Sequence, residues 1–386
     1  MSTEKKFLNV GIVGCGFVSA YYMRTASLYK NLKFVGATDL IKERAEKFSS
    51  HYKVPLFESV DAMMANKNID IILNLTNPHS HYEIAKKALS NGKHVYCEKP
   101  LATDVNEAKE LKSLADEHNL QLSSAPCSYL SSTAQTLKEA VKNKKIGDIK
   151  LVYAEMDDGP VHLMNPENWK NELGVPWPIE EEFETGCTLE HIAYTLSWLL
   201  QMFGPAVHVT AFSHCLMPKK MEFIKEIYTP DFSVACIQHE SGVITRLTCG
   251  LLAPVDRSLT IIGEKGILRV DDTWDNQAPV RMNLYTSLKL KAERKEWIAN
   301  NWLLRKVFNL NYKDVPLINP AKKPIKLIPE KIRMDYLLGV SDLAEAALSG
   351  KNPVLDSTFS LHVTELSLKI QEAQQTGQKI DITTRF

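Results

Sequence analysis

The sequence predicts an α/β protein with two parts: a doubly wound parallel sheet, and an α+β domain with an open, largely antiparallel sheet. Short apolar runs alternate with helical patterns over the first 125 residues, β-rich stretches dominate beyond about residue 145, and hairpin turns are expected at 240–242 and 263–266. The chain has 386 residues, whereas single cores seldom grow past about 250–300 residues. We therefore expect two domains, residues 1–125 and 126–386.

In the first domain, apolar runs predict parallel strands, and apolar residues at helical spacing predict the crossover helices between them. Gly92 stands where one of these helices would end. The expected strands are Asn9–Val13, Lys33–Thr38, Ile69–Thr76, His94–Cys97 and Leu120–Ala125, and the expected helices are Lys42–Tyr52, His81–Asn91 and Val105–Asn119.

In the second domain, hairpin signals between β-rich runs predict the antiparallel sheet. The expected strands include Lys150–Glu155, Val207–Phe212, Phe232–His239, Val243–Cys249, Ser258–Ile262 and Ile267–Val270. We expect one face of this sheet to be covered by helices at Thr188–Phe203, Ile332–Ser349 and Ser360–Gln375. The lysine-rich and proline-rich stretch Lys289–Lys331 supports no prediction.

Charge and cysteine usage limit the partners. Forty-six basic residues balance 46 acidic ones, so we expect no attraction to nucleic acid or to an anionic membrane, and a small-molecule ligand instead. The seven cysteines lack the paired short spacings of a zinc site, and their odd number suits reduced thiols, so we expect neither a metal nor disulfides. No long apolar segment opens the chain, which favours a cytoplasmic protein over a secreted one.

A glycine turn follows the first expected strand and indicates a dinucleotide site. Gly14 allows a tight turn, Gly16 allows close approach of a pyrophosphate, and the next helix presents its N-terminal amides to the phosphates. Ser19 replaces the third glycine of the usual fingerprint. The alternative is an ordinary strand-to-helix turn. The residues expected to hold the cofactor here are Gly14, Cys15, Gly16, Phe17 and Val18.

Asp39 ends the second expected strand, twenty residues after Ser19. A carboxylate there accepts hydrogen bonds from both ribose hydroxyls and repels a 2′-phosphate. The sequence therefore predicts NAD as the cofactor and makes NADP less favoured.

An acid and a lysine followed by proline end the fourth expected strand, within the run N-G-K-H-V-Y-C-E-K-P. Groups at the carboxyl ends of parallel strands face the ligand crevice, so we expect Glu98 and Lys99 near the nicotinamide end of the dinucleotide. The alternative is that they form a surface ion pair.

These motifs together resemble the glucose–fructose oxidoreductase / inositol dehydrogenase (Gfo/Idh/MocA) family. The resemblance rests on the E-K-P run, the glycine turn, and Thr76-Asn77-Pro78 with His81 five residues after Thr76. It implies a Rossmann-type first domain, an open-faced second sheet, cofactor contacts at Thr76, Asn77 and His81, and a sugar, inositol or nucleotide-sugar substrate. It also implies that Lys99 lies beside the nicotinamide and the reacting carbon.

The family's second catalytic element has the pattern G-x-x-x-D-x-x-x-H, and the matching segment here begins at Gly186. Glu190 stands at the aspartate position and Tyr194 at the histidine position, so both project from one helical face although both residue types differ. Either Tyr194 acts as the acid/base, with its pKa lowered by Lys99 and its position fixed by Glu190, or His191 turns into the site. The alternative is that Tyr194 is a core aromatic and Glu190 a satisfied buried acid.

An acidic and aromatic loop is expected to form a wall of the substrate cleft. Aromatic faces beside carboxylates suit a polyhydroxylated ring, and the alternative is a rigid loop with a solvated acidic face. Many relatives have an arginine after the fifth strand, where this chain reads A-P-C-S-Y-L, so arginine anchoring is not expected. The loop comprises Asp157–His162, Trp169, Pro176–Pro178 and Glu180–Glu182.

The sequence thus predicts an enzyme that transfers a hydride between the nicotinamide and a secondary alcohol of a sugar or polyol. Chemistry of this kind needs a base for the hydroxyl proton and positive charge near the developing alkoxide. A hydrolase or epimerase that oxidises its substrate transiently, and a dinucleotide-binding sensor without catalysis, are the alternatives. The open sheet face and the resemblance predict a homo-oligomer, a dimer or a tetramer.

Overall fold

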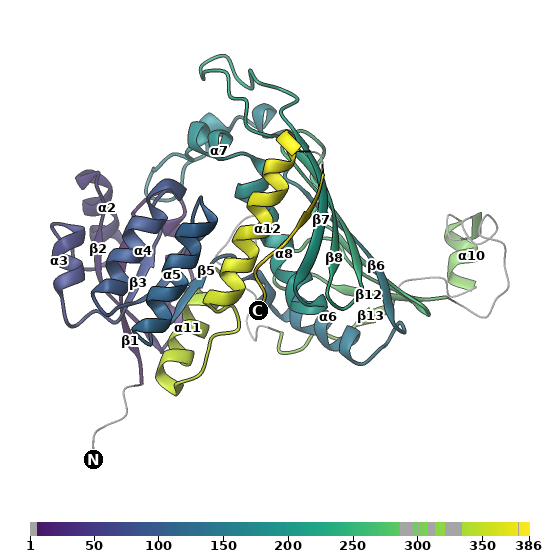
Figure 1. Ribbon diagram of the computed structural model, residues 1–386, viewed down its shortest axis with the longest axis horizontal. Helices are drawn as coiled ribbons and strands as arrows, with labels where there is room; N and C mark the ends of the chain where they lie inside the picture. Colours follow the sequence, from purple (N-terminus) through teal and green to yellow (C-terminus); the bar gives the residue numbers. More distant parts are fainter. Residues whose placement is uncertain (1–5, 286–296, 299–300, 308–312, 321–333, 377) are drawn as a thin grey trace.

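The computed structural model describes residues 6–285, 297–298, 301–307, 313–320, 334–376 and 378–386 (Figure 1). Most of 289–331 lies outside the described residues. The chain forms two sheets, with the long helix α12 (Ser357–Thr376) between the two layers of structure (Figure 1).

The first sheet is parallel throughout and has the strand order β2-β1-β3-β4-β5. The order reverses between β1 and β3, and ligands bind at such a switch point outside the carboxyl ends of the strands. Its strands are β1 (Leu8–Val13), β2 (Leu32–Thr38), β3 (Ile71–Asn74), β4 (His94–Cys97) and β5 (Leu122–Ser124). Its helices are α1 (Ser19–Met23), α2 (Lys42–Tyr52), α3 (Val60–Ala65), α4 (His81–Ser90) and α5 (Val105–Glu117).

The second sheet has nine strands in the order β13-β12-β11-β10-β6-β9-β8-β7-β14. All neighbours pair antiparallel except β6 and β9, so the expected largely antiparallel sheet is confirmed. Its strands are β6 (Ile149–Asp157), β7 (Ala206–His214), β8 (Phe232–His239), β9 (Ile244–Gly250), β10 (Leu259–Gly263), β11 (Gly266–Val270), β12 (Val280–Leu284), β13 (Lys313–Val315) and β14 (Lys379–Asp381).

Helices cover one face of this sheet. In β8, Ala235 and Ile237 point toward them and are buried, whereas the intervening Cys236 is exposed on the open face. Helix α8 is buried on nearly every side because it packs between the sheet and α12. The remaining helices are α6 (Ser132–Lys142), α7 (Ile179–Thr185), α8 (Cys187–Phe203), α10 (Trp302–Val307) and α11 (Leu337–Ser349), and 3-10 turns lie at Ala26–Leu28, Pro78–Ser80, Ser128–Leu130, Val161–Leu163 and Pro166–Asn168.

Helix α11 does not cover the second sheet, and that prediction is wrong. Its apolar residues Leu337, Val340 and Leu343 belong to the core of the first sheet, together with Tyr96 of β4. Gly339 makes the packing close, since a Cβ at this position would lie 2.3 Å from the Tyr96 hydroxyl. The helical spacing showed which face is buried but not which sheet receives it.

No helix in the described ranges is long and apolar enough to cross a membrane. All seven cysteines are free thiols, and only Cys236 is exposed.

Candidate active site

The glycine turn has the geometry that a pyrophosphate needs. Gly14 adopts φ +98°, and a Cβ there would lie 2.5 Å from the Leu75 carbonyl oxygen, so only glycine fits. A Cβ on Gly16 would meet nothing within 4 Å, which leaves open space over the turn for a ligand. Ser19 is fully buried and donates to the Gly16 carbonyl at 2.7 Å, so it closes the turn where the fingerprint has its third glycine.

Asp39 lies beside this turn at the end of β2. Its carboxylate accepts the Cys15 amide at 2.7 Å and the Ile41 amide at 2.7 Å. The side chain is half-buried, so the oxygens keep lone pairs that face solvent. The structure therefore places the acid where the sequence predicts it and couples it to the turn.

His81 holds two loops of the crevice together. Its Nδ1 lies 2.6 Å from the Pro100 carbonyl oxygen and its Nε2 lies 3.0 Å from the Thr76 carbonyl oxygen. Burial lowers the pKa of the imidazole. His81 thus fixes the backbone at Thr76 and after Lys99, while the Asn77 side chain accepts the Ser80 amide at 3.1 Å.

Lys99 and Glu190 form a buried ion pair between the two domains. Only 13% of the Lys99 side chain and 4% of the Glu190 side chain are exposed. Burial by itself lowers the pKa of the Lys99 ammonium, but the carboxylates of Glu190, Glu182 and Glu98 outweigh burial and raise it. Lys99 therefore stays cationic although its side chain is buried.

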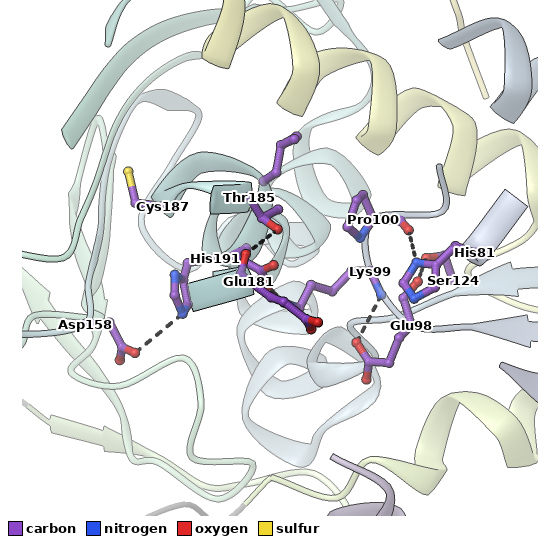
Figure 2. A network of polar contacts seen from close by, with 12 residues as sticks. His81, Glu98, Lys99, Pro100, Ser124, Asp158, Glu181, Thr185, Cys187 and His191 are labelled. Atoms are coloured by element: carbon purple, nitrogen blue, oxygen red, sulfur yellow. Dashed lines mark hydrogen bonds and ion pairs between the residues drawn. The ribbon is translucent and has the colours of Figure 1, made fainter. Parts of the chain in front are cut away.

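Glu98 is buried and does not pair with the Lys99 ammonium. Its carboxylate accepts the Tyr22 hydroxyl at 2.7 Å. It also accepts the Lys99 backbone amide at 3.0 Å (Figure 2). The alternative of a surface ion pair between Glu98 and Lys99 is thus excluded by the structure. Glu98 instead holds the backbone that carries Lys99.

Glu182 of α7 adds a second carboxyl beside Glu190. Burial and the neighbouring charge of Glu190 raise the pKa of Glu182 well above its usual value. Burial also acts to raise the pKa of Glu190, but the Lys99 ammonium outweighs it, and the net pKa of Glu190 is lowered. The two neighbouring acids are thus shifted in opposite directions, with Glu190 favoured as the carboxylate and the protonated form of Glu182 favoured by burial.

Tyr194 lies next to Lys99, whose Nζ is 5.9 Å from the centre of the phenol ring. Burial, Tyr336 and nearby carboxylates raise the pKa of the Tyr194 hydroxyl well above 10. The prediction that Lys99 would lower this pKa is therefore wrong. The main physical reason is that burial disfavours the charged phenolate, and in addition Glu190 forms an ion pair with Lys99 and so offsets its positive charge.

His191 lies on the side of helix α8 that faces Asp158. Its Nε2 lies 3.5 Å from an Asp158 carboxylate oxygen, and its Nδ1 is buried without a hydrogen-bond partner. In Figure 2 the ring points toward Asp158, and Lys99 lies on the side away from Asp158. Burial lowers the pKa of His191, so the imidazole is neutral at neutral pH and Nδ1 or Nε2 is a proton acceptor.

Arg257 and Trp274 hold Asp158 and His191 in place. Arg257 donates to Asp158 at 2.9 Å, lies 3.5 Å from Asp272, and sits 4.3 Å from the centre of the Trp274 ring. Trp274 contacts Tyr194, with ring centres 4.7 Å apart, and stacks on His191. The predicted acidic loop therefore enters the site through Asp158.

The other predicted part of this loop spans the domain boundary above the glycine turn. Asn171 donates to the Phe17 carbonyl at 3.1 Å and to the Gly16 carbonyl at 3.4 Å. Glu172 accepts Arg24 at 2.8 Å and the Tyr52 hydroxyl at 3.1 Å. Trp169 and Trp177 pack on each other with ring centres 5.1 Å apart. This segment, residues 169–177, is called the strap below.

Sequence reasoning missed Arg257, Trp274 and Tyr336, which complete the surroundings of His191 and Tyr194. They stand 60 or more residues away in the chain and carry no local motif. The only signal was composition, an arginine and a tryptophan in loops beside expected strands. No group of three or more metal-binding side chains occurs in the part of the chain that the structure describes.

Comparison with known proteins identifies both domains. Residues 8–125 match the family model described as "Oxidoreductase family, NAD-binding Rossmann fold", and residues 134–269 match the "GFO/IDH/MocA C-terminal domain". The chain belongs to the GFO/IDH/MocA family. It is accordingly an NAD(P)-dependent oxidoreductase.

Individual members of the GFO/IDH/MocA family are distant from this chain. An uncharacterized oxidoreductase of Schizosaccharomyces pombe is 31% identical over 160 residues, which cover 41% of this chain and 40% of the relative. The trans-1,2-dihydrobenzene-1,2-diol dehydrogenase of Mus musculus is 24% identical over 298 residues, 75% of this chain and 80% of the relative. A levoglucosan dehydrogenase solved in complex with NADH has a TM-score of 0.77 at 16% identity, covering 98% of this chain and 99% of that structure, and thus shares the fold.

Proposed function

We propose that this protein oxidises, reversibly, a secondary alcohol of a sugar, an inositol or a related polyol, with NAD as the hydride acceptor. The observation that supports the proposal is the buried Lys99 ammonium, which Glu190 holds just beyond the carboxyl end of β4, the edge at which parallel sheets bind their ligands. The relatives named as dehydrogenases of a diol and of levoglucosan support a hydroxylated ring as substrate.

The residues around the glycine turn fit a dinucleotide. The open space at Gly16 suits the pyrophosphate, and Asp39 suits an unphosphorylated ribose because a second anion would be repelled. Bound NAD supplies the hydride acceptor, and the remaining chemistry belongs to the protein. We infer that NAD is preferred to NADP on the strength of Asp39.

Lys99 is proposed to stabilise the alkoxide that develops as the alcohol loses its proton. An ammonium held in a water-poor cleft needs little reorganisation when negative charge appears beside it. Glu190 keeps the ammonium charged and in position, and Glu98 and His81 hold the backbone on either side of it. Removing Lys99 should therefore affect turnover more than cofactor binding.

The protonation states favour His191 over Tyr194 as the base. With a pKa above 10, fewer than about one in 10³ Tyr194 side chains is ionised at pH 7. His191 is neutral and has Asp158 next to one ring nitrogen, the arrangement that orients a general base. We propose that His191 accepts the proton and that Tyr194 donates a hydrogen bond to the substrate oxygen or packs beside it.

The test is a spectrophotometric assay at 340 nm with NAD or NADP and a panel of uncharged sugars and polyols. Net NADH formation that requires one of these alcohols supports the proposal. NAD binding in calorimetry with no turnover of any alcohol would contradict it and would favour the non-catalytic sensor.

A second candidate is an epimerase or hydrolase that oxidises its substrate transiently. The strap favours this candidate, because Asn171 and Glu172 close over the glycine turn and a retained cofactor suits a reaction without net redox change. Product formation from a sugar at substoichiometric NAD, without NADH accumulation, would distinguish this reaction from the dehydrogenase.

A further inference from the structure

We infer that the substrate site selects uncharged hydroxylated molecules and rejects phosphorylated or carboxylated ones. This inference rests on the proposed function and narrows its substrate class. The sugar, inositol and nucleotide-sugar substrates expected from the sequence include both neutral and anionic compounds. The charged groups around Lys99 and His191 favour the neutral compounds over the anionic ones.

Carboxylates outnumber cations around the reacting position. Glu98, Glu182 and Glu190 act on Lys99, and Asp158 and Glu190 act on His191. Even when Glu182 is left out, the carboxylates of Glu98, Glu190 and Asp158 outnumber the cations of Lys99 and Arg257. Within the described ranges, the cations that act most strongly on these groups are Lys99 and Arg257.

Both cations are already bound to carboxylates of the protein. The Lys99 ammonium pairs with Glu190, and both side chains are almost fully buried. The Arg257 guanidinium donates to Asp158 at 2.9 Å, lies 3.5 Å from Asp272 and covers the Trp274 ring, and only 16% of the side chain is exposed. A phosphate entering the site would have to displace one of these carboxylates or lie next to it, and either is unfavourable.

Neutral hydrogen-bonding atoms are free in the same wall. The Nε1 of Trp274 and the Nδ1 of His191 are buried and have no partner, and the two rings stack on each other. The Nε of Arg257 also lacks a hydrogen-bond partner, although its Nη1 donates to Asp158. Buried polar atoms of this kind are normally satisfied, so they indicate a ligand that supplies donors and acceptors. Hydroxyl groups do both, whereas a phosphate dianion offers acceptors only.

The experiment compares glucose with two anionic derivatives that keep the same ring, glucose 6-phosphate and glucuronate. For the native protein with NAD, we expect kcat/KM to be at least about 100-fold higher for glucose than for either anion. An equal or higher kcat/KM for the phosphate or the carboxylate overturns the inference, while still supporting a sugar oxidoreductase.

Variants test the electrostatic origin of the selection. Asp158→Asn removes one carboxylate and frees part of Arg257, so it should raise the ratio of phosphorylated to neutral turnover by about tenfold or more. The control is Glu264→Gln, which removes an acid that pairs with Lys150 on the β10–β11 turn and should leave the ratio unchanged. An unchanged ratio in Asp158→Asn, or an equal rise in both variants, overturns the electrostatic argument.

A binding measurement keeps the two proposals apart. The melting temperature of the NADH-loaded protein is recorded with each ligand, without any requirement for turnover. Stabilisation by the neutral ligands alone supports the charge selection even if no alcohol is oxidised, an outcome that contradicts only the proposed reaction. Stabilisation by glucose 6-phosphate alone, or by none of the ligands, overturns the charge selection.

Discussion

Replacing Lys99 by methionine tests the central electrostatic claim, because it removes the ammonium and keeps most of the side-chain volume. The Glu190 carboxylate, with 4% of its side chain exposed, is then left buried without its cation. Breaking a buried pair in this way costs about 3–5 kcal/mol of unfolding free energy. Loss of the charge beside the alkoxide should lower kcat by about 10²-fold or more, with NAD affinity changed only a few-fold.

A double variant separates stability from catalysis. Glu190→Gln leaves Lys99 without its partner, whereas Lys99→Met with Glu190→Gln leaves no buried charge at this position. The double variant should therefore recover most of the stability lost in Lys99→Met, a coupling of about 2 kcal/mol or more, while kcat stays low. Urea unfolding gives the free energies, the 340 nm assay gives kcat, and calorimetry gives the NAD affinity.

The pH dependence of the same variants follows from the shifted pKa values. The pKa of Lys99 is raised in the folded state. Its contribution to the free energy of unfolding is therefore fully present below the pKa of an unfolded lysine, about 10.4, and is lost as the pH rises through the folded pKa. The pKa of Glu190 is lowered in the folded state. Its contribution to the free energy of unfolding is therefore fully present above the pKa of an unfolded glutamate, about 4.3, and is lost as the pH falls through the folded pKa. The stability difference between native and Lys99→Met protein should thus shrink as the pH falls, because without Lys99 burial raises the pKa of Glu190 and the variant relieves its unpaired charge by taking up a proton.

Two results would refute this reasoning. Near-normal turnover in Lys99→Met would remove Lys99 from the chemistry. A double variant no more stable than Lys99→Met would show that the pair contributes nothing to folding through its charge, whatever its role in the reaction.

Further predictions concern the base, the cofactor and the strap. His191→Asn should lower kcat by about 10²-fold or more, and Tyr194→Phe by about tenfold or less. The native acid limb of kcat/KM should have an apparent pKa below about 6.5 and should vanish in His191→Asn, and an active His191→Asn beside an inactive Tyr194→Phe would reverse the assignment. Asp39→Ala should weaken NAD binding about tenfold or more and relax the preference over NADP in calorimetry, and tighter binding of NADPH to the native protein would contradict the preference. Asn171→Ala should speed NADH dissociation in stopped-flow fluorescence, and an unchanged rate would show that the strap does not retain the cofactor.

The parallel half of the fold is well predicted from sequence because its signals are local. The predicted helix Lys42–Tyr52 and strand His94–Cys97 match the structure residue for residue. The predicted strand Ile69–Thr76 is longer than β3, because Leu75 and Thr76 already belong to the crevice loop that His81 binds. Apolar runs continue past the end of the ladder, so the pattern alone overestimates the strand.

Local sequence patterns do not identify the packing partners that lie far away in the chain. The spacing of Leu337, Val340 and Leu343 correctly indicates a helix with one buried face, but the sheet that receives this face is fixed by the chain path. The site has the same property. The motif locates Lys99, but the charge it delivers to Tyr194 depends on Glu190, which stands 91 residues later.

The changes on helix α8 can be explained by what each residue contacts. Glu190, at the position where the family pattern has an aspartate, is still a carboxylate and still reaches across the domain boundary, and here it binds Lys99. Tyr194, at the histidine position, is packed against Trp274, and burial raises the pKa of its hydroxyl although Lys99 lies nearby. The imidazole of the helix now stands three residues earlier, at His191, where Asp158 of the acidic loop faces it. Helix α8 thus brings a carboxylate to the Lys99 ammonium and an imidazole to the Asp158 carboxylate, which are the two pairings that the proposed alcohol oxidation uses, although neither residue of the motif is retained.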